Sequence, residues 1–496
     1  MKKIKRVAIA NRGEVAVRII KACEEMGIET VLLHSEVDIN SRAYRMATKT
    51  VCIGPAETSK SYLNIAANIE GAIAGGAEAV HPGFGFLSEN ADFAEACEKA
   101  GLVFIGPSAQ SIRALGDKVH CKELAKKAGL PLVPGYDGDH QDVSTLITQA
   151  EKIGYPVIVK AAAGGGGRGM KLIRDGKDAR ELIESAQREA ESAFGSPKVF
   201  LEKYLDHAKH IEFQIFGDST GQVVHFYDRE CSVQRRHQKI IEEATSPSLT
   251  EELRRRMGEA AVAIAELGKY KGAGTVEFLL QDGEFYLLEV NTRLQVEHPV
   301  TEMVMGVDLV KSQILTAQGE LVFGPQQVRL PHGHSIECRI YAENPYLGGV
   351  PSTGLLGKVT WPEGPGRRYE FGFEEGDEIT SYYDPMIAKV IVWDESRTRA
   401  IQKMIRVLKD SVVFGVHTNI PYLIEILSHQ EFIKGTMNTR FIETYFADSL
   451  KEPALTPLES KIVAQASQQA ANRGLATAIA IGTDFVSPWQ SYWRGV

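Results

Sequence analysis

The stretch TVEFLLQDGEFYLLEVNTRLQVE, residues 275–297, decides more of the fold than any other part of the chain. Two runs rich in β-forming residues flank Gln281-Asp282-Gly283, a sequence typical of a hairpin turn. If all three turn residues form the loop, Glu277 and Glu289 project from the same face of the hairpin. A two-residue loop would put them on opposite faces, because side chains alternate along a strand.

The two glutamates lie within apolar strands, where a carboxylate is costly unless it is paired or binds a metal. Mg²⁺ prefers carboxylate and phosphate oxygens. The sequence therefore predicts that Glu277 and Glu289, helped by Asn291, form a site for a divalent cation. The alternative is a partly solvated face of the sheet.

Polar residues continue beyond this hairpin at every second position, from Glu289 through Arg293 to Glu297. A fully extended strand would separate its ends by roughly 26 Å, at ~3.3 Å per residue. That distance is too great for a metal ligand and a general base to act on one small substrate. We therefore expect the chain to leave the strand near Asn291 or Arg293 and to fold back.

A glycine run, Ala163 to Met170, is centred on Gly165, Gly166 and Gly167 and lies between two predicted strands of opposite direction. It is not a Walker A loop, because GK[ST] is absent and no helix follows. Exposed backbone N–H groups and a flexible chain suit a flap that closes over phosphates. The alternative is a mobile hairpin tip.

A third cluster, Glu230 to Lys239, is strongly cationic and suits an anionic ligand better than a protein core. In a straight strand His237 and Lys239 share one face and Gln234 has the other, so a common pocket requires a bend. Cys231 is interpreted as a small packed residue without a catalytic role.

The first hundred residues alternate short apolar strands with amphipathic helices, which predicts an open parallel sheet. The turn at residues 9–14 lacks GxGxxG, which argues against a dinucleotide site. Beyond Pro331 short strands and a helix at 397–409 predict a mixed domain.

Composition narrows the class of protein. The formal net charge of -8 argues against a nucleic-acid binder, which needs a dominant basic face. No run approaches ~20 apolar residues, so no membrane span is expected. The six cysteines are scattered without a CxxC pair, which suits a reducing cytoplasm.

Together these motifs resemble the biotin carboxylase family of ATP-grasp enzymes, over about Lys5 to Tyr445. The landmarks are ANRGE at 10–14, HPGFGFLSEN at 81–90, the glycine run, the 230–239 cluster and the segment 289–299. Phe84 is a departure, because the family usually has tyrosine there and a hydroxyl is lost.

The resemblance implies an α/β and α+β multidomain fold. It consists of a Rossmann-like pre-ATP-grasp domain (1–116), an ATP-grasp domain (117–330) with a mobile lid at about 132–204, a mixed α+β C-terminal domain (331–447) and a helical tail or linker (448–496).

The resemblance also implies the site residues. ATP would be bound by Lys118, Lys160, Glu202, Lys203, Leu205, His210, Gln234, His237 and the flap glycines. Mg²⁺ or Mn²⁺ would be held by Glu277 and Glu289. Glu297 would deprotonate bicarbonate, which is held by Lys239, Arg293, Gln295 and the Val296 backbone. Arg339 would stabilise the biotin enolate oxygen. Without the motif, Arg293 and Arg339 would be read as surface ion pairs.

The implied reaction carboxylates biotin through carboxyphosphate. No lysine lies between methionines, so the biotin is expected on a separate carrier protein or biotinylated domain, with a carboxyltransferase subunit as a further partner. The family implies a homodimer. Alternatives are another ATP-grasp ligase, acting on a carboxylate and an amine or forming carbamoyl phosphate, and a non-catalytic nucleotide sensor.

Overall fold

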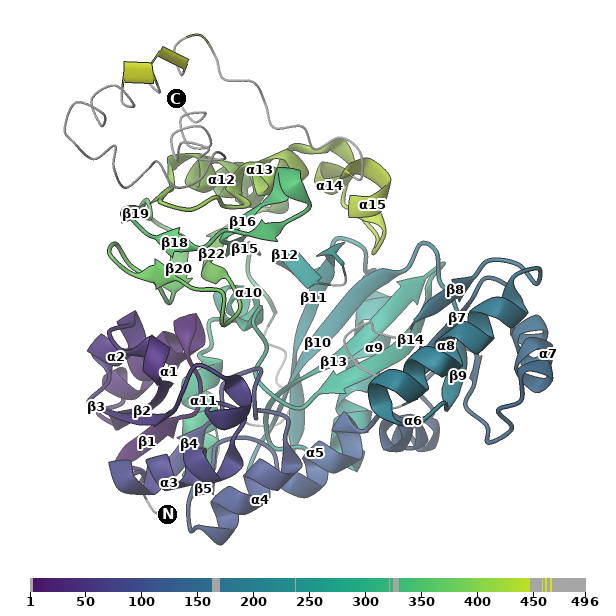
Figure 1. Cartoon of the computed structure of the whole chain (residues 1–496), viewed down its shortest axis with the longest axis horizontal. Helices are drawn as coiled ribbons and strands as arrows, with labels where there is room; N and C mark the ends of the chain where they lie inside the picture. The colour runs from purple at the N-terminus through teal and green to yellow at the C-terminus, as the bar shows by residue number, and fades with distance from the viewer. Residues whose placement is uncertain are drawn as a thin grey trace.

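The computed structural model describes residues 3–162, 170–236, 238–320, 322–323 and 330–446, and five isolated positions between 457 and 465. Figure 1 shows the arrangement of its elements. The central glycines of the predicted flap, His237 and nearly all of the predicted tail lie outside these ranges.

The N-terminal part is built on a five-stranded parallel sheet, in the order β3-β2-β1-β4-β5. The predicted open parallel sheet is therefore confirmed, with β3 as a strand beyond those predicted. The strands are β1 (Arg6–Ile9), β2 (Glu29–Ser35), β3 (Lys49–Gly54), β4 (Ala79–His81) and β5 (Val103–Phe104). The helices are α1 (Gly13–Glu25), α2 (Arg42–Met46), α3 (Ile65–Gly75), α4 (Ala91–Lys99) and α5 (Ala109–Gly116), with short turns η1 (Glu36–Asp38) and η2 (Thr58–Lys60).

A small unit follows helix α6 (Lys118–Lys127) and projects to one side of the molecule in Figure 1. Its four-stranded sheet has the order β6 (Gly135–Tyr136), β9 (Val199–Lys203), β7 (Val157–Ala161), β8 (Lys171–Ile173). Helices α7 (Val143–Ile153) and α8 (Ala179–Phe194) pack on it. Strands β7 and β8 are antiparallel, as predicted for the strands flanking the glycine run.

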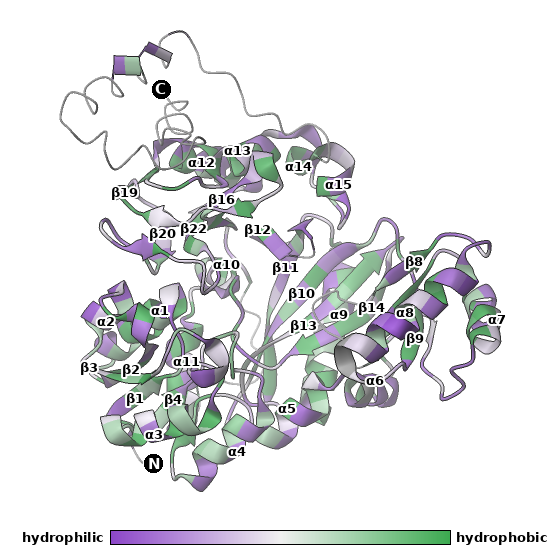
Figure 2. Cartoon of the chain, viewed as in Figure 1, coloured by the Kyte–Doolittle hydropathy of each residue, from purple (hydrophilic) through white to green (hydrophobic). Residues whose placement is uncertain are grey.

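Helix α8 shows why these residues form an amphipathic helix. Its buried residues Ala179, Ile183, Ala186 and Ala190 recur at helical spacing. In Figure 2 the exposed side of α8 is hydrophilic, whereas β13 and β14 in the large sheet are mainly hydrophobic.

The largest element is an eight-stranded antiparallel sheet. Its order is β14 (Glu284–Asn291), β13 (Gly272–Gln281), β10 (Lys209–Gly217), β11 (Val223–Arg235), β12 (Gln238–Ala244), β15 (His334–Tyr341), β22 (Met386–Asp394), β20 (Arg367–Phe371). Strands β12 and β15 pair through Ile241 and Cys338, so the sheet continues across the predicted boundary near residue 330.

The remaining elements pack around this sheet. The helices are α9 (Glu251–Leu267), α10 (His298–Met305), α11 (Leu309–Ala317), α12 (Arg397–Asp410), α13 (Ile420–Ser428), α14 (Gln430–Lys434) and α15 (Phe441–Phe446). Short strands are β16 (Glu343–Asn344), β17 (Val350–Pro351), β18 (Gly354–Leu355), β19 (Lys358–Thr360), β21 (Glu378–Ile379) and β23 (Val412–Phe414), with the turn η3 (Pro345–Leu347). Among the described helices, none has the length and apolar character needed to cross a bilayer.

The hairpin of β13 and β14 corrects one prediction. Gln281 pairs with Glu284, so the loop has two residues, Asp282 and Gly283, both with positive φ (54° and 81°). The three-residue loop, the condition under which the two glutamates were expected to share a face, is therefore not formed. A register shift farther along pairs Phe278 with Leu287 but Glu277 with Glu289. This bulge, which adds Leu288, restores the two glutamates to one face.

Candidate active site

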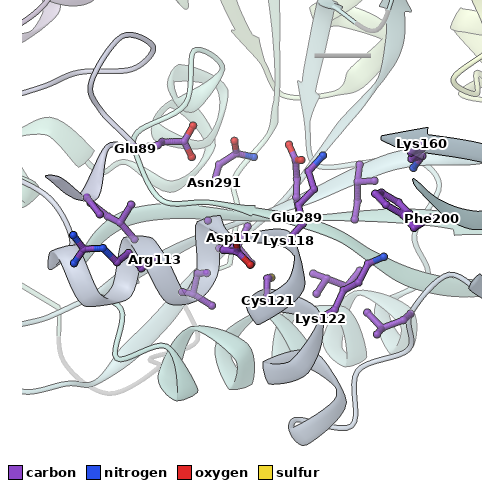
Figure 3. A pocket seen from close by; sticks show the side chains of 18 of the residues that line it. Glu89, Arg113, Asp117, Lys118, Cys121, Lys122, Lys160, Phe200, Glu289 and Asn291 are labelled. Carbon is purple, nitrogen blue, oxygen red and sulfur yellow. The ribbon is translucent and has the colours of Figure 1, made fainter. Parts of the chain in front are cut away.

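A cavity of about 380 Å³ lies between α6, the small sheet and β14. Figure 3 shows the side chains around it. The predicted residues that line it are Lys118, Lys160, Glu202, Glu289 and Asn291. Further lining residues that sequence reasoning did not single out include Cys121, Lys122 and Phe200.

Glu202 holds two of the cavity's cations. Its carboxylate lies 2.5 Å from Lys160 Nζ and 2.8 Å from Lys122 Nζ. Burial opposes the charged form, but the two lysines outweigh it and hold the pKa of Glu202 below its usual value. Polyanionic ligands can therefore meet cations that are already fixed in place.

Four of the described residues predicted to bind ATP, Lys203, Leu205, His210 and Gln234, do not line this cavity. Lys203 Nζ donates hydrogen bonds to the carbonyls of Gly154 and Tyr155, at 2.7 and 2.8 Å. Leu205 lies just beyond β9 and is partly buried. The side chain of Lys203 is thus occupied in holding the small unit together.

The predicted metal site is supported by the charges at the end of the hairpin. Glu277 and Glu289 are direct cross-strand partners, and Asn291 Nδ2 donates to Glu277 Oε1 at 2.9 Å. Burial, together with the charge of Glu277, raises the pKa of Glu289. Two adjacent carboxylates and an amide supply oxygen ligands of the kind that Mg²⁺ prefers, and Glu277 is already paired with Lys239 and His210, each at 2.8 Å.

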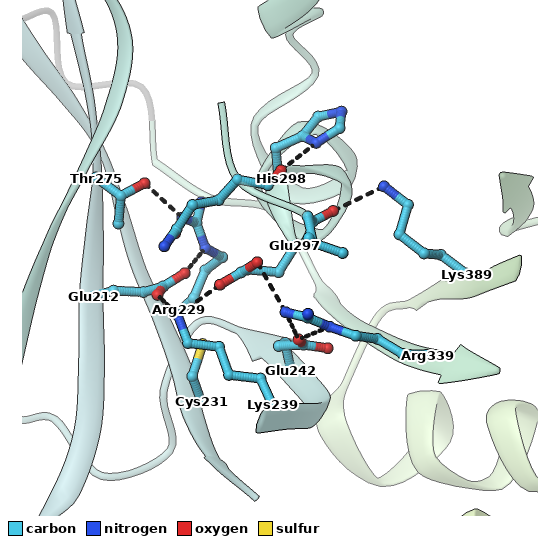
Figure 4. A network of polar contacts seen from close by, with 12 residues as sticks. Glu212, Arg229, Cys231, Lys239, Glu242, Thr275, Glu297, His298, Arg339 and Lys389 are labelled. Atoms are coloured by element: carbon cyan, nitrogen blue, oxygen red, sulfur yellow. Dashed lines mark hydrogen bonds and ion pairs between the residues drawn. The ribbon is translucent and has the colours of Figure 1, made fainter. Parts of the chain in front are cut away.

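Lys239 joins this site to the predicted base. Its Nζ lies 2.5 Å from Glu212, 2.8 Å from Glu277 and 2.7 Å from Glu297, as Figure 4 shows in part. Strand β14 ends at Asn291, and Glu297 immediately precedes α10. The prediction that the chain folds back between these points is confirmed.

The bend predicted in the cationic cluster is a hairpin turn. Gln234 pairs with Lys239 and Arg235 with Gln238, so the chain reverses between Arg235 and Gln238. Gln234 and Lys239 therefore share a face, and Gln234 Nε2 lies 2.9 Å from His210 Nδ1. His210 Nε2 in turn lies 2.8 Å from Glu277 Oε2.

The environment of Glu297 stabilises its charged form. Its other oxygen, Oε2, lies 3.0 Å from Arg339 Nη2. Burial opposes ionisation, but Lys239 and Arg339 outweigh it and hold the pKa of Glu297 below its usual value. Arg339 also donates to Glu242 at 2.6 Å and is 11% exposed, so it is not a surface ion pair. Arg293, by contrast, is a partly exposed partner of Glu89 at 2.9 Å.

A second cavity of about 670 Å³ begins at Arg293, Val296 and Arg339. The sequence landmarks at 10–14 and 81–90 form its other wall, with Glu14 and Phe84 among the lining residues. Tyr382 and Tyr383 line it from the C-terminal part. A ligand here would meet both the predicted bicarbonate residues and an aromatic surface.

Sequence reasoning missed two fully buried members of the site. Arg229 forms an ion pair with Glu212 and donates to Gln295 Oε1 at 2.9 Å, and Gln295 donates to Glu277 at 2.7 Å. One signal was available for Glu212, because it alternates with His210 and Gln214 within an apolar strand. Cys231 is also fully buried, and burial raises its pKa, as expected of a packed thiol.

Three family models match the chain. They are the biotin carboxylase N-terminal domain at residues 3–112, the ATP-binding domain of the carbamoyl-phosphate synthase L chain at 117–322, and the biotin carboxylase C-terminal domain at 337–444.

Curated relatives agree with these models. The chain is 47% identical to the methylcrotonoyl-CoA carboxylase subunit alpha of Dictyostelium discoideum, over 91% of this chain and 65% of that subunit. It thus spans slightly less than two thirds of that relative. It is also 47% identical to biotin carboxylase 1 of Bacillus subtilis, over 89% of this chain and 99% of that protein.

A solved structure is similar throughout. It is the biotin carboxylase domain of the Hydrogenobacter thermophilus 2-oxoglutarate carboxylase, in complex with MgADP, ADP and bicarbonate. The two share 45% identity and a TM-score of 0.85, over 90% of this chain and 98% of that one. With matches along nearly its whole described length, this chain belongs to the biotin carboxylase family.

Proposed function

We propose that the chain carboxylates biotin with bicarbonate and MgATP, giving carboxybiotin, ADP and phosphate. The observation that carries the proposal is the position of Lys239. Its ammonium group contacts Glu277 from the predicted metal site and Glu297, whose chain neighbour Val296 lines the second cavity. A nucleotide phosphate and a small carbon acid bound on either side would therefore meet within reach of one cation.

The nucleotide is assigned to the first cavity. Lys118 and Lys160 offer cations to its phosphates, and the pairing of Lys160 with Glu202 fixes that cation before the ligand arrives. Mg²⁺ or Mn²⁺ held by Glu277 and Glu289 would neutralise phosphate oxygens during transfer.

Bicarbonate is assigned to the mouth of the second cavity, beside Arg293, Gln295 and the Val296 backbone. Glu297 takes its proton, and the resulting oxyanion attacks the γ-phosphorus of ATP, so that ADP leaves. A base works best with a pKa near the working pH. Anionic substrates draw Lys239 and Arg339 away from Glu297, which raises its pKa from the low value of the free site.

The carboxyphosphate so formed breaks into CO₂ and phosphate. Phosphate removes the proton from the biotin ring nitrogen, and the nitrogen attacks CO₂. Arg339, fixed by Glu242, donates hydrogen bonds to the ureido oxygen as negative charge develops there.

The wider assignments are also proposals. They comprise the predicted domain boundaries, biotin presented by a separate carrier, a carboxyltransferase partner and a cytoplasmic location. Self-association as a homodimer is included, and the similar Hydrogenobacter domain is a dimer in its solved form.

The proposal is tested by replacing Glu297, the proposed general base. Glu297→Gln keeps the side-chain size, so ATP should bind normally while bicarbonate-dependent ATP cleavage falls by roughly 10²–10⁴-fold, the usual contribution of a general base. Phosphate release is measured with free biotin and bicarbonate. Glu259→Gln, at an exposed position on α9, is the control.

Near-normal cleavage by Glu297→Gln would reject Glu297 as the base. Stimulation of the unmodified chain by ammonia or an amine in place of biotin would instead support another ATP-grasp ligase. Tight ATP binding without turnover with any acceptor would support the nucleotide sensor.

A further inference from the structure

Lys389 is a fully buried lysine on β22, in a part of the sequence that no motif marks. In the large sheet it lies directly opposite Arg339 on β15 and opposite Glu370 on β20. These three side chains therefore form a row across neighbouring strands, on one face of the sheet. Lys389 extends that row toward the loop that carries Glu297.

The ammonium group of Lys389 meets three partners from distant parts of the chain. It donates a hydrogen bond of 2.8 Å to the carbonyl oxygen of Val296, visible beside Glu297 in Figure 4. It lies 2.7 Å from Glu370 Oε2 and 3.3 Å from Glu14 Oε2. Burial opposes its charge, but the nearby carboxylates outweigh it and raise the pKa of Lys389.

The Val296 carbonyl is a sensitive point in the site. It belongs to the peptide group that leads directly into Glu297, so a rotation there would swing the Glu297 carboxylate. The neighbouring positions are also anchored: His298 Nδ1 lies 2.7 Å from Gln295 O, and Arg229 donates to the Gln295 side chain. Lys389 fixes the Val296 carbonyl, which lies in the chain between the anchored residues Gln295 and His298.

We propose that Lys389 is a positioning residue for the reaction, one that holds the Val296 carbonyl so that Glu297 faces Lys239 and Arg339. Glu14 on α1 and Glu370 on β20 fix its ammonium group. This gives the 10–14 landmark a part in the chemistry without contact with the reacting atoms. The inference rests on the proposed function.

The test is Lys389→Met, which keeps the length of the side chain and removes the charge and the hydrogen bond. We expect kcat for bicarbonate-dependent ATP cleavage to fall by on the order of 100-fold, the effect of an ångström-scale displacement of a catalytic group. The KM for ATP should stay within about three-fold, because the first cavity is not touched.

A matched control separates this effect from the loss of any buried cation. Arg397 also joins a buried carboxylate, Glu243, to backbone carbonyls at Phe432 and Ile433, outside the residues that line either cavity. Arg397→Met should lower the melting temperature while kcat changes little. Equal losses of kcat in Lys389→Met and Arg397→Met would overturn the proposal.

A second variant covers the risk that Lys389→Met folds poorly. Burial raises the pKa of Glu14 to about 7 even beside Lys389, so Glu14 is readily neutralised. In Lys389→Met/Glu14→Gln the Glu14 carboxylate is gone and Glu370 keeps its ion pairs with Arg18 and Arg368, so the melting temperature should recover. If kcat remains low relative to Glu14→Gln alone, Lys389 positions the base.

If kcat recovers together with the melting temperature, Lys389 is structural and the inference fails. A failure of the proposed function looks different, because the unmodified chain would then show no ATP cleavage dependent on bicarbonate and biotin. The two failures are therefore told apart by the unmodified chain alone.

Discussion

At the scale of single residues, the site holds more carboxylates than one lysine can neutralise. Glu212, Glu277 and Glu297 all contact Lys239, and Arg229 and Arg339 supply the balancing charge. Such a buried network is costly unless every member is paired. Its arrangement is therefore sensitive to a bound cation or anion, which is what a site for MgATP and bicarbonate requires.

The partly exposed pair Arg293–Glu89 permits a calibrated prediction. Their side chains are 19% and 39% exposed, and Glu89 also accepts from the Thr292 N–H at 3.1 Å. Pairs this accessible contribute about 0.2–1 kcal/mol. Glu89→Gln should thus raise the KM for bicarbonate about two- to five-fold. The KM for ATP is measured as well, because Glu89 also lines the first cavity.

Steady-state kinetics with varied bicarbonate checks the expected rise in the KM for bicarbonate. Glu375→Gln, which breaks an exposed pair with Lys358 far from Arg293 in the sequence, is the control and should leave both KM values unchanged. A rise in KM of more than tenfold for Glu89→Gln would show that this pair organises the site much more than an accessible ion pair should.

At the scale of elements, the bulge at Leu288 rather than the turn places the metal carboxylates together. A regular hairpin closed by Asp282 and Gly283 would have put Glu277 and Glu289 on opposite faces. The extra residue, Leu288, shifts the register by one position, so that Glu277 and Glu289 share a face. The turn therefore serves stability, while the bulge sets the register at the site.

If the turn contributes only stability and the bulge sets the register, the effect of Gly283→Ala can be predicted. The added Cβ would meet no atom within 4 Å, so the cost is the positive φ of 81°, about 1 kcal/mol. The melting temperature should fall slightly, while the Mg²⁺ concentration for half-maximal activity stays the same. Gly195→Ala, at φ 72° and equally open, is the matched control.

An increased Mg²⁺ requirement in Gly283→Ala, and not in Gly195→Ala, would show that the turn controls the register after all. Metal titration of phosphate release therefore separates the two roles of the hairpin.

Local patterns were enough to predict many elements. The helix predicted at 397–409 begins at Arg397 and ends at Asp410, one residue later than predicted, because apolar spacing and terminal residues are local signals. The bulge could not be predicted, since one extra residue leaves no periodic trace. The pairing of β12 with β15 was also missed, because strands nearly a hundred residues apart meet only through tertiary packing.

The same limit applied to the site. Glu277 and Glu289 were found because carboxylates within apolar strands stand out, and the role of Glu297 was implied by the family resemblance. Arg229 and Lys389 were not, since each is a single cation whose partners come from distant strands.

At the scale of the whole molecule, ion pairs join the N-terminal and C-terminal parts around the site. Arg18 on α1 contacts Glu302 and Glu370, and Lys389 contacts Glu14. The eight-stranded sheet crosses between the second and third predicted regions. The second and third predicted regions thus share a sheet, and buried charges join the N-terminal region to the C-terminal one.

Cleavage of the chain tests whether the shared sheet holds the second and third predicted regions together. If a protease site is placed within residues 324–329 and cut, the two fragments should co-elute at micromolar concentration and keep bicarbonate-dependent ATP cleavage. The reason is that the β12–β15 ladder and the Arg339–Glu242 pair join them without the connecting segment. High salt should not separate them, because buried pairs are weakly screened. Separation on size-exclusion chromatography in moderate salt would show instead that the connection, and not the shared sheet, holds the site together.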